Sequence, residues 1–157
     1  MSDKMICPVC GKTEFLEKHN NDICGFCGWE NDYFLEEGGA NVLSLSEYQK
    51  RYHIYIYLNP EYTWKINGHP ELTVKDLCVY WHQYSISNKQ SVLSSNRCGC
   101  FFCQKIFESN MISETYINDK NGETAICPFC GVDAILPDSK VDLSEALLED
   151  MYKIWFT

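Results

Sequence analysis

Four Cys-x-x-Cys pairs constrain the fold of this chain more than any other feature of its sequence. A separation of two residues lets one tight turn direct both sulfur atoms at a single ion, with Zn–S distances of about 2.3 Å. Three of the pairs are followed by glycine, which tolerates the positive φ that such a turn can require. The pairs are Cys7/Cys10, Cys24/Cys27, Cys100/Cys103 and Cys127/Cys130.

The spacing between these pairs predicts two separate metal sites. Thirteen residues separate Cys10 from Cys24, and 23 separate Cys103 from Cys127. Both gaps suit a hairpin that returns the second turn to the first, as in a zinc ribbon. We therefore expect two structural Zn²⁺ ions per chain. The predicted ligands are Cys7, Cys10, Cys24 and Cys27 at one site and Cys100, Cys103, Cys127 and Cys130 at the other.

Other chemistries of paired cysteines fit the pattern less well. A thioredoxin-type redox site has one such motif at a helix start within a βαβ unit, whereas these pairs come in matched sets. Iron–sulfur clusters also bind through four cysteines and stay open as an alternative. A catalytic zinc keeps an open position beside three protein ligands, so four thiolates predict closed sites that activate no water.

Two further cysteines lie outside the pairs. Cys78 falls on the apolar face of a predicted helix, where a free cysteine commonly acts as a small buried residue. Cys98 lies two residues before Cys100 and is expected to be a spare thiol beside the second site. The alternative is that Cys98 replaces Cys100 as a ligand.

We predict no catalytic residues. No His-Asn-His nuclease motif accompanies the second cysteine group, and Asp133 and Asp138 after it are expected to be solvated loop carboxylates. No phosphate-binding loop or Ser-His-Asp order is evident. An enzyme with an unrecognised site stays open as an alternative. The histidines, none of them paired at metal-ligand spacing, are His19, His53, His69 and His82.

The charge of the chain bears on its partners. The formal net charge is −9, and eight thiolates with two Zn²⁺ ions would bring it to −13. Nucleic-acid binding requires a basic face that releases counterions from phosphate, and Lys50-Arg51 is the only adjacent basic pair. The acidic balance favours a protein partner, a basic one in particular, over nucleic acid. A nucleic-acid-binding or nuclease-associated zinc-ribbon protein is the alternative.

We expect a cytoplasmic location. The first residues contain no apolar stretch typical of a signal peptide, and no segment is long and apolar enough to span a bilayer. Thiols stay reduced in the cytosol, so ten cysteines indicate metal binding before disulfides.

The predicted fold class is small α+β, with two zinc-ribbon-like four-cysteine modules, each followed by a helix, and a helical segment between them. Capping-box and periodicity signals predict helices over residues 44–57, 73–84, 87–93 and 142–155. A turn at Asp119–Gly122 should join strands near 113–118 and 123–127. The predicted division is residues 1–58 for the first ribbon and helix, 59–97 for the connecting segment, and 98–157 for the second ribbon and C-terminal helix.

Two stretches resemble known families. Cys7-Pro8-Val9-Cys10-Gly11, Cys24-Gly25-Phe26-Cys27-Gly28-Trp29 and Gly39-Ala40-Asn41 resemble the bacterial cysteine-rich CPCC domain family over residues 5–52. Residues 76–157, with Cys127-Pro128-Phe129-Cys130-Gly131 and the terminal Met151-Tyr152-Lys153-Ile154-Trp155, are similar to a family of small bacterial proteins described only as cytoplasmic. CPCC-type domains occur among toxin-immunity systems, so the first resemblance implies a partner-binding role.

The aromatic and acidic stretch 29–37 is the predicted contact region for a protein partner, because aromatic residues anchor interfaces and acids can form their rim. The alternative is that its aromatic residues, beginning with Trp29, close the core beneath the first metal site.

Overall fold

The computed structural model describes residues 4–32, 39–112 and 116–157, and it divides into two compact units. Met1–Glu71 form the N-terminal unit and Leu72–Thr157 the C-terminal unit, each with one four-cysteine group. This boundary falls inside the predicted connecting segment, 59–97. The mixed α and β content, with two four-cysteine groups followed by helices or sheet, confirms the predicted fold class.

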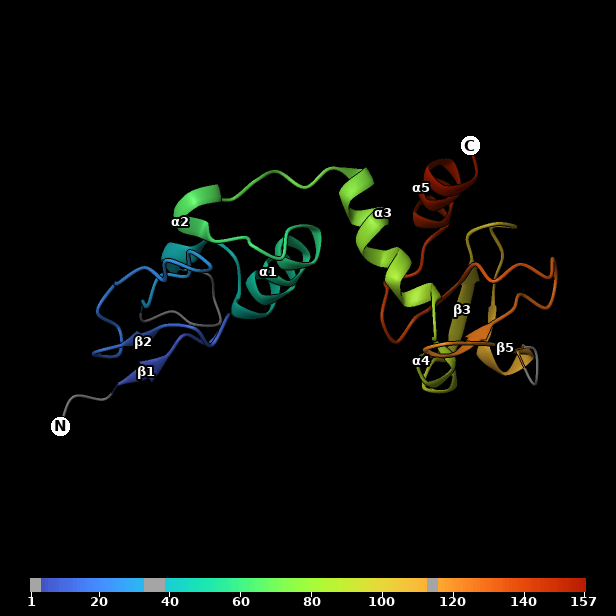
Figure 1. The fold of residues 1–157 in the computed structure, drawn as a ribbon, viewed down its shortest axis with the longest axis horizontal. Helices are drawn as coiled ribbons and strands as arrows, with labels where there is room; N and C mark the ends of the chain where they lie inside the picture. Colours follow the sequence, from blue (N-terminus) through green and yellow to red (C-terminus); the bar gives the residue numbers. More distant parts are fainter. Residues whose placement is uncertain (1–3, 33–38, 113–115) are drawn as a thin grey trace. The chain divides into compact units, whose positions relative to one another are not determined.

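The N-terminal unit combines a short antiparallel strand pair with one long helix (Figure 1). Met5 pairs with Phe15 and Ile6 with Glu14, which places the first cysteine turn, the one formed by Cys7 and Cys10, at the end of this strand pair. The long helix begins after Ser44, whose side chain forms the predicted capping box with Glu47. The elements are β1 (Met5–Ile6), β2 (Glu14–Phe15), η1 (Gly39–Asn41), α1 (Leu45–Leu58) and α2 (Trp64–Asn67).

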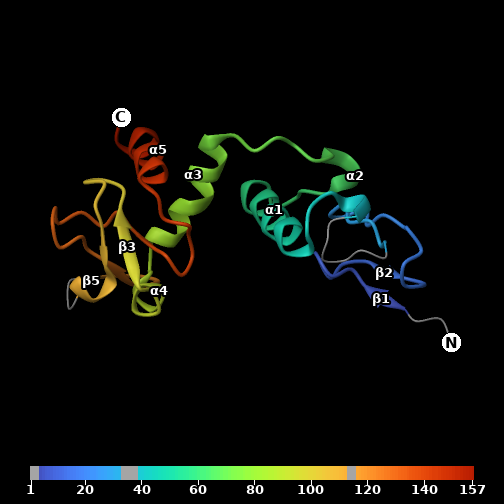
Figure 2. The same ribbon diagram turned by 180° about the vertical axis from the view of Figure 1, so that it is seen from behind.

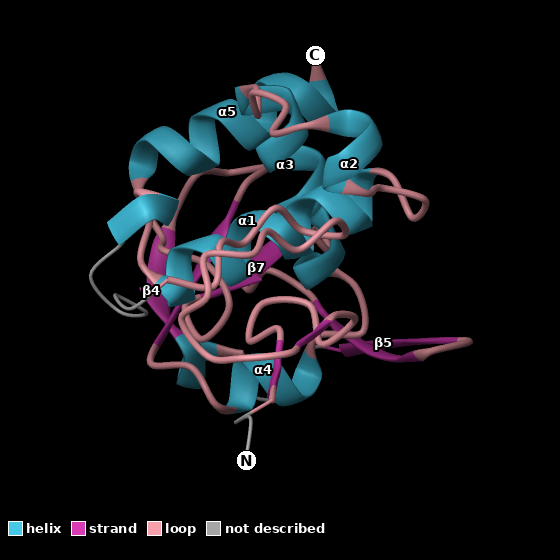
Figure 3. Cartoon of the chain, turned by 90° about the vertical axis from the view of Figure 1, so that its left-hand side faces the viewer, coloured by secondary structure: helices cyan, strands magenta, loops and turns pink. Residues whose placement is uncertain are grey.

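The C-terminal unit is built on a three-stranded antiparallel sheet in the order β4-β3-β7. A separate hairpin, β5–β6, lies between the two cysteine turns in sequence, and Figure 3 shows it in magenta at the label β5. The helical elements are α3 (Val74–His82), η2 (Gln83–Ser85), α4 (Lys89–Leu93), η3 (Ser109–Met111) and α5 (Glu145–Phe156). The strands are β3 (Arg97–Cys100), β4 (Ile106–Glu108), β5 (Tyr116–Asp119), β6 (Gly122–Ala125) and β7 (Ile135–Pro137).

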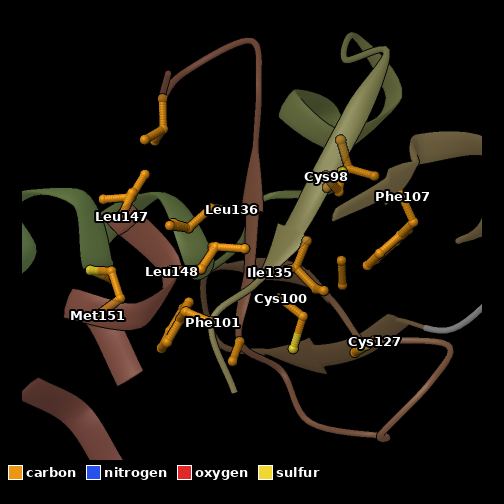
Figure 4. Close-up of a cluster of buried hydrophobic side chains, with 14 of the residues drawn as sticks. Cys98, Cys100, Phe101, Phe107, Cys127, Ile135, Leu136, Leu147, Leu148 and Met151 are labelled. Atoms are coloured by element: carbon orange, nitrogen blue, oxygen red, sulfur yellow. The ribbon is translucent and has the colours of Figure 1, made fainter. Parts of the chain in front are cut away.

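The core of the C-terminal unit lies between its sheet and α5. Leu147, Leu148 and Met151 of α5 are buried, and Figure 4 shows them on the side of Ile135 and Leu136 of β7. Helices α3 and α5 contact each other, and they lie side by side when the unit is seen from either face (Figures 1 and 2). Helix and sheet therefore cover one continuous apolar cluster, which also contains Cys98 and Cys100.

The ends of two helices differ from the prediction. Helix α5 begins at Glu145 after a Ser144 N-cap rather than near Asp142. Its residue Trp155, near the C-terminal end, is 39% exposed. Helix α4 is preceded by Asn88 rather than Ser87, because Ser87 has a φ of 48° and donates its N–H to Thr124.

Other local predictions are confirmed. Thr73 and Asp76 form a capping box at the start of α3, and the turn after Asp119 joins β5 to β6. The part of the first predicted strand at 113–115 lies outside the described residues. Within the described ranges, none of the helices combines the length and the apolar character required to cross a bilayer.

Asn88 is a buried polar residue that connects three elements of the C-terminal unit. Its side-chain amide donates to the carbonyl oxygens of Ile135 in β7 (2.9 Å) and Tyr84 in η2 (3.2 Å). Its amide oxygen accepts the N–H of Ala125 in β6 at 2.9 Å. Because Asn88 is only 3% exposed, water cannot readily replace these bonds.

We predict that Asn88→Ala lowers the free energy of unfolding of the C-terminal unit by about 3 kcal/mol, because it leaves buried backbone groups without partners. Denaturant unfolding and amide hydrogen exchange at Ala125 measure the effect. Asn96→Ala is the matched control: Asn96 is exposed, so this change should cost less than about 0.5 kcal/mol. Equal losses in the two variants would contradict the role given to Asn88.

Candidate metal centres

The first candidate centre brings together Cys7, Cys10, Cys24 and Cys27, whose sulfur atoms all lie within 4.8 Å of one another. The Cys7–Cys27 and Cys10–Cys24 sulfur pairs are each 3.5 Å apart. Four sulfur atoms at about 2.3 Å from a tetrahedral zinc would be about 3.8 Å from one another. The donor set and its spacing therefore fit one tetrahedral thiolate-bound ion.

The second candidate centre brings together Cys100, Cys103, Cys127 and Cys130 within the same limit. The Cys100–Cys130 and Cys103–Cys127 sulfur pairs are each 3.7 Å apart, which fits the tetrahedral spacing closely. Cys100 and not Cys98 belongs to this group, although β3 carries both residues. Cys98 is fully buried in the apolar core.

All four cysteine turns share one hydrogen-bond pattern. In each turn the residue after the second cysteine donates its N–H to the carbonyl oxygen of the first, at 2.7 to 3.0 Å. The N–H of the first cysteine then donates to a residue five or six positions further on, as from Cys24 to Trp29 at 2.8 Å. Positive φ values occur after all four second cysteines: 68° at Gly11, 80° at Gly28, 60° at Gln104 and 75° at Gly131.

Gln104 is therefore the residue of this series that sequence reasoning missed. The three glycines predicted a positive φ, and the fourth turn requires the same backbone although it carries a side chain. A residue other than glycine in the left-handed region costs roughly 1–2 kcal/mol. The sequence signal was the position, one residue after a Cys-x-x-Cys pair, and not the residue type.

The thiols of the first group share protons when no ion compensates their charge. Hydrogen bonds from Cys27 and Cys7 lower the pKa of Cys24. The hydrogen bond to Cys24, together with burial, raises the pKa of Cys7 to about 12, and the same causes raise the pKa of Cys27. Binding a metal cation to all four sulfur atoms would therefore require the release of the protons that the raised pKa values of Cys7 and Cys27 favour.

In the second group, burial raises the pKa of Cys100 and of Cys127. The pKa of Cys130 is lowered: burial acts against this shift, and the Val132 N–H and the neighbouring thiols outweigh it. Burial thus favours the protonated thiol at Cys100 and Cys127, and a bound cation would favour their thiolate form.

A layer of aromatic residues covers the first group. Trp29 is fully buried and meets Tyr48 edge to face, with their ring centroids 5.2 Å apart. The Tyr48 hydroxyl donates to the carbonyl oxygen of Cys27 at 3.1 Å and lies 2.7 Å from Nε2 of His69. These contacts link α1 and the segment after α2 directly to a ligand-bearing turn.

Helix α2 is attached to the second turn of the first group through its backbone. The N–H groups of Trp64 and Lys65 donate to the carbonyl oxygens of Phe26 and Gly25, at 2.9 and 3.0 Å. The Trp64 ring packs so closely that a Cβ on Gly28 would lie 2.4 Å from Trp64 Cδ1. Gly28 is therefore required both for its φ and for its lack of a side chain.

The predicted contact region is largely buried where the structure describes it. Trp29 and Asn31 are fully buried and Asp32 is 6% exposed. The Asp32 carboxylate accepts the N–H of Ala40 at 2.6 Å. Trp29 thus follows the alternative of closing the core beneath the first thiol group, and the contact region as a whole stays a prediction. Residues 33–37 lie outside the described residues.

Among the described residues, no histidine belongs to either thiol group. His19 pairs with the Asp32 carbonyl, His69 with Tyr48, and His82 stacks on Trp155 with ring centroids 3.9 Å apart. Asp133 is exposed, as expected. Asp138 is a correction, because its carboxylate accepts the N–H groups of residues 96 and 97 and thereby fixes the start of β3.

Comparison with known proteins gives one family match. Residues 5–63 match the family model described as cysteine-rich CPCC, which extends the resemblance expected for residues 5–52 through α1 to the start of α2. No match was found among curated proteins or among solved structures. The family resemblance of residues 76–157 stays a prediction.

We predict that the turn glycines differ in their tolerance of alanine. Gly11→Ala and Gly131→Ala meet no atom within 4 Å and should lower the free energy of unfolding by about 1 kcal/mol through φ strain. Gly28→Ala should cost clearly more, because its Cβ also collides with Trp64 and His69. Denaturant unfolding of the metal-loaded protein measures each loss.

Two further variants complete this series. Gln104→Gly should raise the free energy of unfolding by about 0.5 kcal/mol, since relieved strain exceeds the added chain entropy. Gly25→Ala is the control, because Gly25 has no positive φ and open space around it. A destabilised Gln104→Gly, or a Gly25→Ala as damaging as Gly28→Ala, would refute the conformational explanation.

Proposed function

We propose that this chain is a zinc protein whose two closed centres are structural and which acts by binding another protein. The observation that carries the proposal is the composition of the two centres: four thiols each, at tetrahedral spacing. A four-thiolate shell leaves no position for an activated water, so the metal would supply folding energy and not catalysis. The resemblance of residues 5–63 to the CPCC family is compatible with a toxin-immunity-like role.

Zinc is the proposed ion because it accepts four thiolates in tetrahedral geometry without redox chemistry. Each unit is small, and structural zinc contributes roughly 10 kcal/mol or more to the folding of zinc-finger peptides. The excess of acidic over basic residues, 22 against 13, supports a basic partner over a phosphate backbone. A cytoplasmic location, where thiols remain reduced, is part of the same proposal.

An aromatic patch on the C-terminal unit is a second candidate contact for a partner, besides the stretch 29–37. We define the patch as Phe102, Tyr152, Trp155 and Phe156. The rings of Phe102 and Phe156 meet edge to face, with their centroids 4.9 Å apart. The ring centroids of Tyr152 and Phe156 are 5.8 Å apart. Phe102, Trp155 and Phe156 are each 39–40% exposed. Clustered exposed aromatic residues are typical anchors of protein interfaces.

We predict that elemental analysis of the purified chain finds two zinc ions. Cys100→Ser should reduce this to one, because it opens the second thiol shell, whereas Cys98→Ser should retain two. Cys98 is the matched control, since it lies on the same strand outside the thiol group. Iron in place of zinc, or zinc loss in Cys98→Ser, would show that the assignment is wrong.

We predict that a partner captured by the zinc-loaded chain and then purified associates at least tenfold faster at low salt than at high salt, because opposite charges steer the encounter. Phe156→Ala should weaken its binding at least tenfold while the zinc content stays at two. Ile66→Ala, an 82% exposed apolar residue of the other unit, is the control and should change binding less than twofold. Tight, salt-sensitive binding to DNA or RNA instead would contradict the proposal.

A further inference from the structure

A hollow of about 210 Å³ lies in the N-terminal unit, next to the aromatic layer over the first thiol group. Two of its lining residues, Tyr48 and His69, are the ones that contact the carbonyl oxygen of Cys27. Ligand sites for drug-sized molecules occupy roughly 300–1,000 Å³. This hollow therefore suits a molecule of about amino-acid size. It is lined by Asn41, Val42, Leu43, Tyr48, Arg51 and His69.

Two of the polar residues that line the hollow already form hydrogen bonds with neighbouring segments. The Asn41 amide accepts the N–H of Glu30 at 2.6 Å and donates to the Glu30 carbonyl at 2.9 Å. The Tyr48 hydroxyl donates to Cys27 and contacts His69. These bonds fix the shape of the hollow and leave Arg51 as the principal donor for a ligand.

Arg51 carries the permanent positive charge of the lining. It follows Tyr48 by three residues on α1, so both side chains lie on the same face of the helix. Among the described residues, no carboxylate lines the hollow and no ion pair joins Arg51 to an acidic residue. A guanidinium presents a planar fork of N–H donors that matches the two oxygens of a carboxylate.

The backbone conformation of Val42 is a second observation that favours a ligand site in this hollow. Its φ is 65°, in the left-handed region that a β-branched residue rarely occupies. Its side chain is 85% exposed, so the strained backbone gains no burial in return. Strain of this kind concentrates at ligand-binding segments. Val42 and Leu43 are the apolar residues of the lining.

We propose that this hollow binds a single carboxylate group carried on a small apolar body. One guanidinium balances one negative charge, and apolar walls favour an aliphatic substituent beside it. Residues 1–71 contain 11 acidic and six basic residues, a net charge of −5, so a polyanion would be repelled. Two sources share this chemistry: a free carboxylic acid of amino-acid size and the C-terminal residue of a peptide. The inference goes beyond the proposed function and does not depend on it.

The test uses the full zinc-loaded chain and N-acetyl-L-leucine as the probe, followed by ¹H–¹⁵N NMR. The signals of Val42, Leu43 and Arg51 should shift with saturation in the millimolar range, as expected for so small a ligand. N-acetyl-L-leucinamide, which lacks the charge, should bind at least tenfold more weakly. Equal binding of acid and amide, or no shift at these three residues, would overturn the proposal.

Three variants separate this site from general charge attraction. Arg51→Gln should weaken probe binding at least tenfold, whereas Lys50→Gln, the adjacent exposed cation that does not line the hollow, should change it less than twofold. Val42→Gly should weaken binding and raise the melting temperature, because it removes both the apolar wall and the strain. Equal effects of Arg51→Gln and Lys50→Gln, or unchanged binding in Val42→Gly, would refute the site.

The source of the carboxylate is distinguished by a third probe. A tripeptide ending in leucine, compared with its C-terminal amide, tests capture of a chain end. Binding of the tripeptide acid at least as tight as that of N-acetyl-L-leucine would indicate a peptide terminus, and weaker binding would indicate a free acid. Both results support the carboxylate site. Displacement of the probe by an equal concentration of inorganic phosphate would overturn it.

Discussion

Contact between thiols from distant parts of the chain is the interaction on which each unit depends. In the N-terminal unit the strand pair is only two residues long on each side, and it ends at the first cysteine turn. The second turn is attached to α1 through Tyr48 and to α2 through backbone hydrogen bonds. The thiol group therefore joins the strand pair to the helices, and an ion that replaces the thiol protons would lock that junction.

The repeated hydrogen-bond pattern explains how one chain builds the same turn four times from different residues. Each turn is closed by backbone N–H and C=O groups, so residues such as Phe26 and Phe129 can vary without changing the position of sulfur. What the pattern requires is a left-handed residue after the second cysteine. Gln104 shows that this requirement is conformational, because a glutamine meets it with a φ of 60°.

The sequence predicted the features that depend on local spacing. The cysteine pairs and the capping boxes at Ser44 and Thr73 each require only a few neighbouring residues, and the structure places them as expected. The role of Asn88 could not be found in this way, because two of its three partners lie 37 and 47 residues away. The start of α5 was also mispredicted: Asp142 and Ser144 are both acceptable N-caps, and it is the Ser144 side chain that accepts the Leu147 N–H.

The length of the segment between two cysteine turns sets the entropy cost of bringing them together. A cross-link between turns closes a loop of 13 residues in the first group and 23 in the second. Loop-closure entropy grows only with the logarithm of length, so the longer loop costs about 0.5 kcal/mol more. The second loop uses its extra length for β4, η3 and the β5–β6 hairpin. Among relatives, the segment between turns is therefore free to change in length, whereas the two residues within each turn are not.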